Sequence, residues 1–168
     1  MEIGRIQKKI KRNKKLMVLM IIVLIFVLLW GIYMIAQIPY HEAKNETFQM
    51  AKKYAKVENI NNFYIYNRNQ TYYTIQGKNN NGQEVYVVIP KKGNRVDIFA
   101  KNKGISAIKA NTIVKQNEAP KKIIHTVFGM KDDKTPLWEV AYLNKNNELC
   151  YAQISFKSGK VLQVLNDL

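Results

Sequence analysis

The sequence predicts an α+β protein in which a single membrane-spanning helix precedes two tandem units, each a helix packed on an antiparallel sheet. Three observations carry this prediction: an uncharged apolar run, a strand-rich stretch that recurs 65 residues further on, and a helical stretch before each copy. A chain of 168 residues has room for one domain or two small ones. We expect a basic cytoplasmic tail at 1–15, a transmembrane helix at 16–38, a first unit at 39–102 and a second at 103–168.

The apolar run extends from Leu16 to Ile38, 23 residues without a charge. As a helix it would be roughly 34 Å long, which is enough to cross a hydrocarbon core of about 30 Å. A cleaved signal peptide would have a shorter apolar region followed by small residues, and the bulky neighbours of Ala36 do not fit that pattern. We therefore expect a retained anchor, with Trp30, Tyr33 and Tyr40 near the outer interface.

The basic residues predict which way this helix is oriented. Seven Lys and Arg precede the run against the single Glu2, whereas the ten residues after it contain only Lys44 as a base. The positive-inside rule then places the N-terminus in the cytoplasm and the C-terminal domain outside the cell. A basic cluster next to a span is typical of topology and of contact with anionic lipid. We expect the lipid bilayer, and no nucleic acid, as its partner.

The segment after Ile38 is also basic, with 20 Lys and Arg against 11 Asp and Glu. A surface of this sign attracts polyanions, which outside a cell include lipid headgroups and anionic wall polymers. A basic domain without a specific polymer site is the plainer interpretation. Cys150 is the only cysteine, so an internal disulfide is excluded and packing has to stabilise the fold.

The repeat aligns without a gap. "YYTIQGKNNNGQEVYVVIPKKGNRVD" at 72–97 corresponds to "LWEVAYLNKNNELCYAQISFKSGKVL" at 137–162, so that Tyr73 matches Trp138, Tyr86 matches Tyr151 and Ile89 matches Ile154. Aromatic and β-branched runs separated by Asn, Gly and Lys turns predict strands. The expected strands are 62–67, 71–77, 84–90 and 95–100 in the first copy, and 122–129, 137–143, 149–156 and 160–165 in the second.

A helical stretch precedes each set of strands. From Glu42 to Val57, residues including Thr47, Ala51 and Tyr54 recur at steps of three and four, which indicates an amphipathic helix. In the second copy, Ser106 can cap a helix over 107–117 that ends before Pro120. Both helices could cover the cores or dock a partner, and core cover is the favoured interpretation.

Alternation along the strands predicts which residues face inward. The two inward sets occupy matching positions: Tyr73, Ile75, Val85, Val87 and Ile89, and Trp138, Val140, Cys150, Ala152 and Ile154. Because a unit of about 60 residues is marginally stable alone, we expect the two units to share an interface. Tyr72, Tyr86 and Tyr151 lie on the opposite pleat and are the candidate partner surface; they could instead lie between the units or be ordinary exposed tyrosines.

A search for reactive groups yields no catalytic, cofactor-binding or metal-binding residue. His41 and His125 lack metal-ligand spacing, and Cys150 falls on the inward face as a small packing residue. Four carboxylates are expected to be solvated: Asp132, Asp133, Glu139 and Glu148. Phosphate-binding loops and nucleophile elbows are absent from the sequence. We expect a protein that is not an enzyme.

The basic tail, the span, the helix "HEAKNETFQMAKKYA" and the closing "LWEVAYLNKNNELCYAQISFKSGKVL" together resemble the TseB/YpmB family of Firmicutes, regulators of cell wall elongation. The last stretch also resembles a PepSY unit, in which a Trp begins one strand and a Gly-Lys turn follows the next strand. Here these residues are Trp138 and Gly159-Lys160. The first copy departs from this pattern, with Tyr73 in place of the Trp and Asn94 in place of the Gly. The resemblance implies two cystatin-like units.

The resemblance also implies a function: peptidoglycan-synthesis regulation through contact with a class B penicillin-binding transpeptidase of the elongation machinery. It supplies no catalytic residue. The alternatives are a binder of anionic wall polymers and a PepSY-type module that inhibits a protease.

Overall fold

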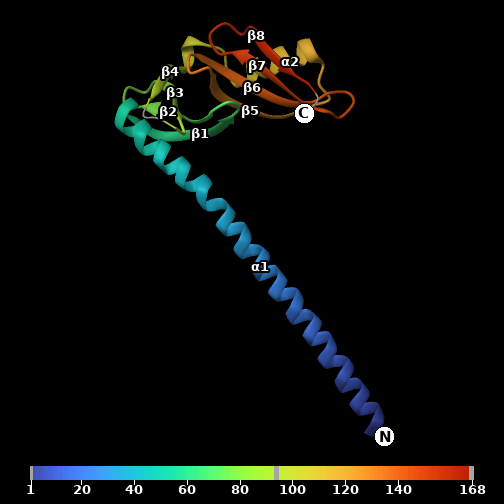
Figure 1. The fold of residues 1–168 in the computed structure, drawn as a ribbon. Helices are drawn as coiled ribbons and strands as arrows, with labels where there is room; N and C mark the ends of the chain where they lie inside the picture. Colours follow the sequence, from blue (N-terminus) through green and yellow to red (C-terminus); the bar gives the residue numbers. More distant parts are fainter. Residues whose placement is uncertain (1, 93–94, 167–168) are drawn as a thin grey trace. The chain divides into compact units, whose positions relative to one another are not determined.

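The computed structural model describes residues 2–92 and 95–166, and it describes side chains from Lys15 onward. Helix α1 (Glu2–Ala55) is followed by two sets of four strands with the short helix η1 (Lys101–Lys103) and helix α2 (Ala107–Glu118) between them (Figure 1). The strands are β1 (Val57–Asn67), β2 (Thr71–Asn79), β3 (Glu84–Pro90), β4 (Asp97–Ala100), β5 (Lys122–Lys131), β6 (Thr135–Leu143), β7 (Leu149–Ser155) and β8 (Val161–Leu165).

Helix α1 contains the predicted apolar segment and the following amphipathic stretch in one continuous helix. We expected two separate helices, and the structure instead carries the helix through Pro39. Among the described residues, α1 provides the one helix that is long and apolar enough to cross a membrane, and its apolar side chains from Leu16 to Ile38 are exposed. The chain divides into two compact units, Met1–Glu42 and Ala43–Leu168, so both sheets belong to the second unit.

Each set of strands forms an antiparallel meander, in the orders β1-β2-β3-β4 and β5-β6-β7-β8. The pairing keeps the 65-residue offset, because Tyr73 lies opposite Ile89 and Trp138 lies opposite Ile154. We name residues 43–100 the first repeat and residues 107–165 the second repeat. The predicted strands are confirmed, with β3 at the predicted bounds and β1 beginning five residues earlier than expected, at Val57.

The first repeat packs one face of its sheet against the last turns of α1. Its buried cluster contains Ala51, Val57, Ile75, Val85, Val87 and Ile89. The predicted inward face is therefore confirmed, except that Tyr73 is only half-buried. Tyr54 was expected to face the core as well, but it is exposed.

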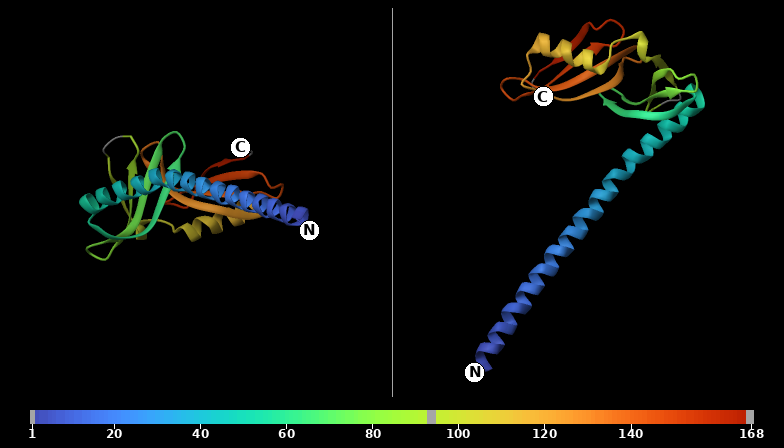
Figure 2. Two further views of the ribbon diagram at one scale, coloured as in Figure 1. Left: turned by 90° about the horizontal axis from the view of Figure 1, so that it is seen from below. Right: turned by 180° about the vertical axis from the view of Figure 1, so that it is seen from behind.

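The second repeat uses the matching face to pack against α2, which lies across its sheet (Figure 2). Ala110 and Val114 of α2 are buried against the predicted set of Trp138, Val140, Cys150, Ala152 and Ile154. Ser106 caps α2 as predicted, because its Oγ accepts a hydrogen bond from the Lys109 backbone at 3.2 Å. The Trp138 indole donates to the Ile105 carbonyl at 2.9 Å, which satisfies its buried N–H.

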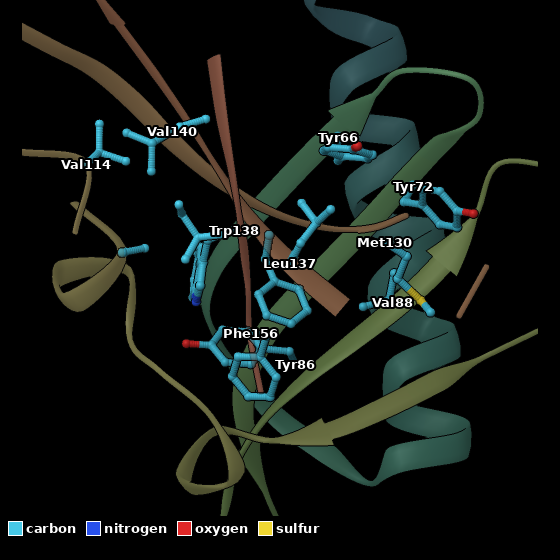
Figure 3. Packing of buried hydrophobic residues seen from close by; sticks show 14 of the residues in the cluster. Tyr66, Tyr72, Tyr86, Val88, Val114, Met130, Leu137, Trp138, Val140 and Phe156 are labelled. Carbon is cyan, nitrogen blue, oxygen red and sulfur yellow. The ribbon is translucent and has the colours of Figure 1, made fainter. Parts of the chain in front are cut away.

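The two sheets share this second core. Tyr66, Tyr72, Tyr86 and Val88, from the face of the first sheet that points away from α1, belong to the same buried cluster as Trp138 (Figure 3). Strand β5 lies against β1 and β2, where the Thr74 hydroxyl donates to the Phe128 carbonyl at 3.1 Å. The expected interface between the repeats is confirmed, and it is largely aromatic.

Candidate functional site

Tyr72, Tyr86 and Tyr151, the predicted partner surface, occupy different environments. Tyr86 is 1% exposed, stacks on Phe128 with ring centroids 4.4 Å apart and meets the Trp138 ring edge-on at 5.4 Å. Burial raises the pKa of its hydroxyl. Tyr86 is thus part of the internal interface and has to be removed from the candidate partner surface, since the apolar face around it is covered by the second repeat.

Tyr72 is also buried, at 3% exposure, beside a turn of the second repeat. Its hydroxyl donates to Asp133, and Arg95 lies 3.4 Å from the same carboxylate oxygen. Burial, together with the hydrogen bond to Asp133, raises the pKa of Tyr72 to about 12. Tyr72 therefore joins the repeats and presents little surface to a partner.

Tyr151 is half-buried on the outer face of the second sheet, which is the face that points away from α2. The Arg68 guanidinium, from the turn between β1 and β2, lies 4.1 Å above the centroid of its ring. This is a cation–π geometry. Of the three predicted tyrosines, Tyr151 alone keeps substantial exposure.

A buried polar network lies beside Tyr151. Arg68 Nε is 2.8 Å from Glu139 Oε2, and the Gln153 amide donates to the same oxygen at 3.3 Å and to the Tyr66 hydroxyl at 3.1 Å. Glu139 and Gln153 are each 4% exposed, so the expectation that Glu139 is solvated is wrong. The positive charge of Arg68 compensates the negative charge of the Glu139 carboxylate, which the neighbouring strands cover.

Three residues of this network, Tyr66, Arg68 and Gln153, line a polar pocket of about 470 Å³ between the turns of the two repeats. The pocket is lined by Tyr66, Arg68, Asn69, Gln70, Tyr72, Met130, Lys131, Asp132, Asp133, Gln153, Gln163 and Leu165. The amide oxygen of Gln153 is covered and has no hydrogen-bond partner in the described part of the chain. Leaving a buried acceptor without a donor is costly.

The remaining predicted groups offer no reactive site. Cys150 is 1% exposed and packs in the core as predicted. Asp132, Asp133 and Glu148 are exposed as expected. Within residues 2–92 and 95–166, no cluster of three or more His, Cys, Asp and Glu side chains is close enough to hold a metal ion.

Sequence reasoning missed Arg68 and Gln153. A signal for Gln153 was present: Glu139 and Gln153 lie on the same pleat and are directly paired across β6 and β7, so two polar side chains had to meet on one face. The approach of Arg68 has no such signal, because it comes from 71 residues earlier and depends on how the two sheets dock.

The described features define a class: an α+β protein that joins an N-terminal helix of membrane-spanning length to a tandem helix–sheet repeat. A family model described as a cell wall elongation regulator TseB-like domain matches residues 46–90. This match and the two relatives described next support an assignment to the TseB/YpmB-like family.

Two relatives, both from Bacillus subtilis, support this assignment. A curated protein from strain 168, named "Probable cell wall elongation regulator TseB", is 28% identical over 137 residues, which are 79% of this chain and 83% of that protein. The solved structure of the YpmB protein is 24% identical, covers 73% of this chain and 95% of its own, and superposes with a TM-score of 0.66. This second match shows a shared fold.

Proposed function

We propose that the protein is a membrane-anchored, extracytoplasmic regulator of cell wall elongation that acts through protein–protein contact. The observation that carries the proposal is the similarity to a relative named as a cell wall elongation regulator, over 79% of this chain. The family model over residues 46–90 supports the same role.

Anchoring and orientation follow from the N-terminal region. The apolar helix has the length of a span, and seven basic residues precede it. These features support a cytoplasmic N-terminus and an external repeat region. A Cys residue introduced at Asn146, in an exposed turn, should react with a membrane-impermeant maleimide in intact cells; reaction only after lysis would contradict this orientation.

The proposed partner is a class B penicillin-binding transpeptidase of the elongation machinery. A tether confines the repeats to a thin layer at the membrane, which raises their effective concentration toward another membrane protein and makes a modest affinity sufficient. The exposed part of this proposed surface is Tyr151 with Arg68 above its ring. The alternative, a PepSY-type module that inhibits a protease, would use a different partner class.

Photo-crosslinking in living cells tests the partner. A benzophenone amino acid replaces Tyr151 in one strain and Tyr86 in a matched control strain, since these residues hold equivalent positions in the two repeats. The proposal predicts a crosslink to the transpeptidase from position 151 and at least tenfold less from position 86, which is buried. Recovery of lipid alone, or of no adduct, from position 151 would contradict it.

Binding of anionic wall polymer is the second candidate function, and the excess of 20 basic over 11 acidic residues after Ile38 favours it. Salt separates the two functions. Polymer binding should weaken steeply between 50 and 500 mM salt because many exposed charges are screened, whereas a protein contact that also includes the Tyr151 ring should weaken less.

A further inference from the structure

Strand β8 is an edge strand with no strand partner on its outer side among the described residues. Its sequence, VLQVL, contains no charge and no proline. Exposed edges offer unpaired backbone N–H and C=O groups to any extended chain, and proteins usually protect them with charges, prolines, bulges or a covering element. The pairing of β8 with β7 has one register shift, between Gln153 and Ile154, but β8 has no charge or proline to protect its free edge.

The other edges are protected. Strand β5 lies against β1 and β2 of the first sheet. Strand β1 has two register shifts and carries Glu58, and β4 has four residues and begins with Asp97, which pairs with Arg95 at 2.6 Å. The contrast between β4 and β8 matters most, because they are equivalent strands of the two repeats. The difference is one of charge: β4 begins with Asp97, whereas β8 contains no charged residue.

The polar pocket opens beside the same edge. Gln163 and Leu165, two residues apart on β8, line the pocket together with Gln153, which pairs with Gln163 across the sheet. Side chains two residues apart on a strand point to the same face. A strand added to β8 would therefore place alternate side chains over the pocket, and backbone pairing with side-chain pockets is the pattern of β-strand addition.

The charge around the edge indicates the chemistry of the incoming segment. The β7–β8 hairpin, residues 149–165, carries Lys157 and Lys160 and no acidic residue. Lys131, in the pocket wall, has an exposed 3.3 Å contact with the Gln163 amide oxygen, so its charge is not neutralised there. The same wall carries Asp132 and Asp133, of which Asp133 is paired with Arg95 at 3.4 Å. The three lysines therefore outnumber the one carboxylate without an ion pair, and they complement an acidic segment.

We infer that β8 is the docking edge for an extended, acidic segment of the partner protein, which pairs with it as a fifth strand and places one side chain in the pocket beside Gln163. This inference rests on the proposed function, because the partner is the protein that the regulator contacts. The equivalent edge strand of the first repeat, β4, begins with Asp97, which would repel an acidic segment.

The test uses the full chain in living cells with a benzophenone amino acid at position 163 or 165, followed by mass spectrometry of the adducts. The matched controls are positions 97 and 99 on β4, which pair with Val88 and Tyr86 as positions 163 and 165 pair with Gln153 and Tyr151. We expect positions 163 and 165 to crosslink to a single partner segment, at sites about two residues apart in one fixed order. Positions 97 and 99 should give at least tenfold less adduct.

Charge variants sharpen the test. Gln163→Glu should reduce crosslinking from position 165 at least fivefold by repelling the acidic segment, whereas Gln163→Lys should retain it. If Gln163→Glu and Gln163→Lys reduce crosslinking equally, the partner segment is not acidic. If the adducts are scattered over unrelated surfaces of the partner, the segment does not add to β8 as a strand. If position 151 crosslinks to the transpeptidase while 163 and 165 give no adduct, the docking edge fails and the proposed function stands. If none of the three positions gives a protein adduct, both fail.

Discussion

Tyr86 and Tyr151 hold equivalent positions in the two repeats, yet one is sealed between the sheets and the other lies on an open face under Arg68. In the first repeat the face that points away from its helix is buried by the second repeat. In the second repeat the same face meets Tyr66 and the turn that carries Arg68, beside the polar pocket, and Tyr151 stays half-buried. The face that carries Tyr86 in the first repeat is thus part of the core, whereas the equivalent face in the second repeat, which carries Tyr151, remains available for contact.

The sequence differences between the copies follow this division. Val88 and Thr74 lie on the covered face, and their equivalents on the open face are Gln153 and Glu139. An apolar residue gains free energy where a neighbouring sheet removes it from water. The polar pair on the second sheet is also buried, and Arg68 and Tyr66 supply its partners. Position-by-position comparison of the repeats therefore shows where the packing of the two copies differs.

The largest change in stability is expected when the equivalent aromatic residues on the helix-facing sides of the two sheets, Trp138 and Tyr73, are replaced. Trp138→Ala removes ring contacts with Tyr64, Tyr86 and Phe128 and should lower the free energy of unfolding by about 3–5 kcal/mol. Tyr73→Ala, at the half-buried equivalent, should cost less than half as much. Denaturant unfolding of the full chain in detergent measures both, and equal losses would show that the copies are not packed differently.

Gly129→Ala tests the contact between the repeats. A Cβ at Gly129 would lie 2.3 Å from the Tyr66 ring, so the two sheets must separate and the free energy of unfolding should fall by up to about 3 kcal/mol. Gly31→Ala, where the added Cβ meets open space, is the control. In a Tyr66→Ala background the Gly129→Ala change should cost much less, and full additivity in this double-mutant cycle would refute the contact.

Arg68→Ala tests the polar network on the open face. The change leaves Glu139, whose side chain is 6% exposed, without its cationic partner and should cost about 2 kcal/mol. Arg95→Ala breaks a more exposed pair and should cost less than about 1 kcal/mol. The same unfolding assay measures the loss of stability in both variants. If Arg68 were only a surface charge, Arg68→Ala would cost no more free energy of unfolding than Arg95→Ala.

A smaller change in folding stability is expected at alkaline pH. Burial raises the pKa of both Tyr66 and Tyr72 to about 12 in the folded chain, whereas the unfolded value is about 10. The folded state then holds the proton more tightly, so their contribution to stability is complete below about pH 10 and is lost between about pH 10 and 12. Tyr72→Phe should make the decline in denaturation midpoint from pH 9 to 11 shallower than in the unchanged chain; an identical slope would contradict this.

Local patterns were sufficient to predict most of the fold. Period-two alternation located the strands and the pleat that contains Ile75 and Val140, and the Ser106 cap placed the start of α2. Alternation identifies two faces but does not say which neighbour covers each, so Tyr86 and Tyr151 could not be separated from the sequence. The continuation of α1 through Pro39 was also missed, because a proline normally ends a helix pattern.

Amide hydrogen exchange of the full chain, with and without the extracytoplasmic part of the transpeptidase, tests the central claim most directly. We predict that binding slows exchange in β8 (Val161–Leu165) and in the turn at 68–70, and leaves the equivalent strand β4 (Asp97–Ala100) unchanged. Protection of β4 without β8, or no protection in either strand, would contradict the assignment of contact to the open face of the second repeat.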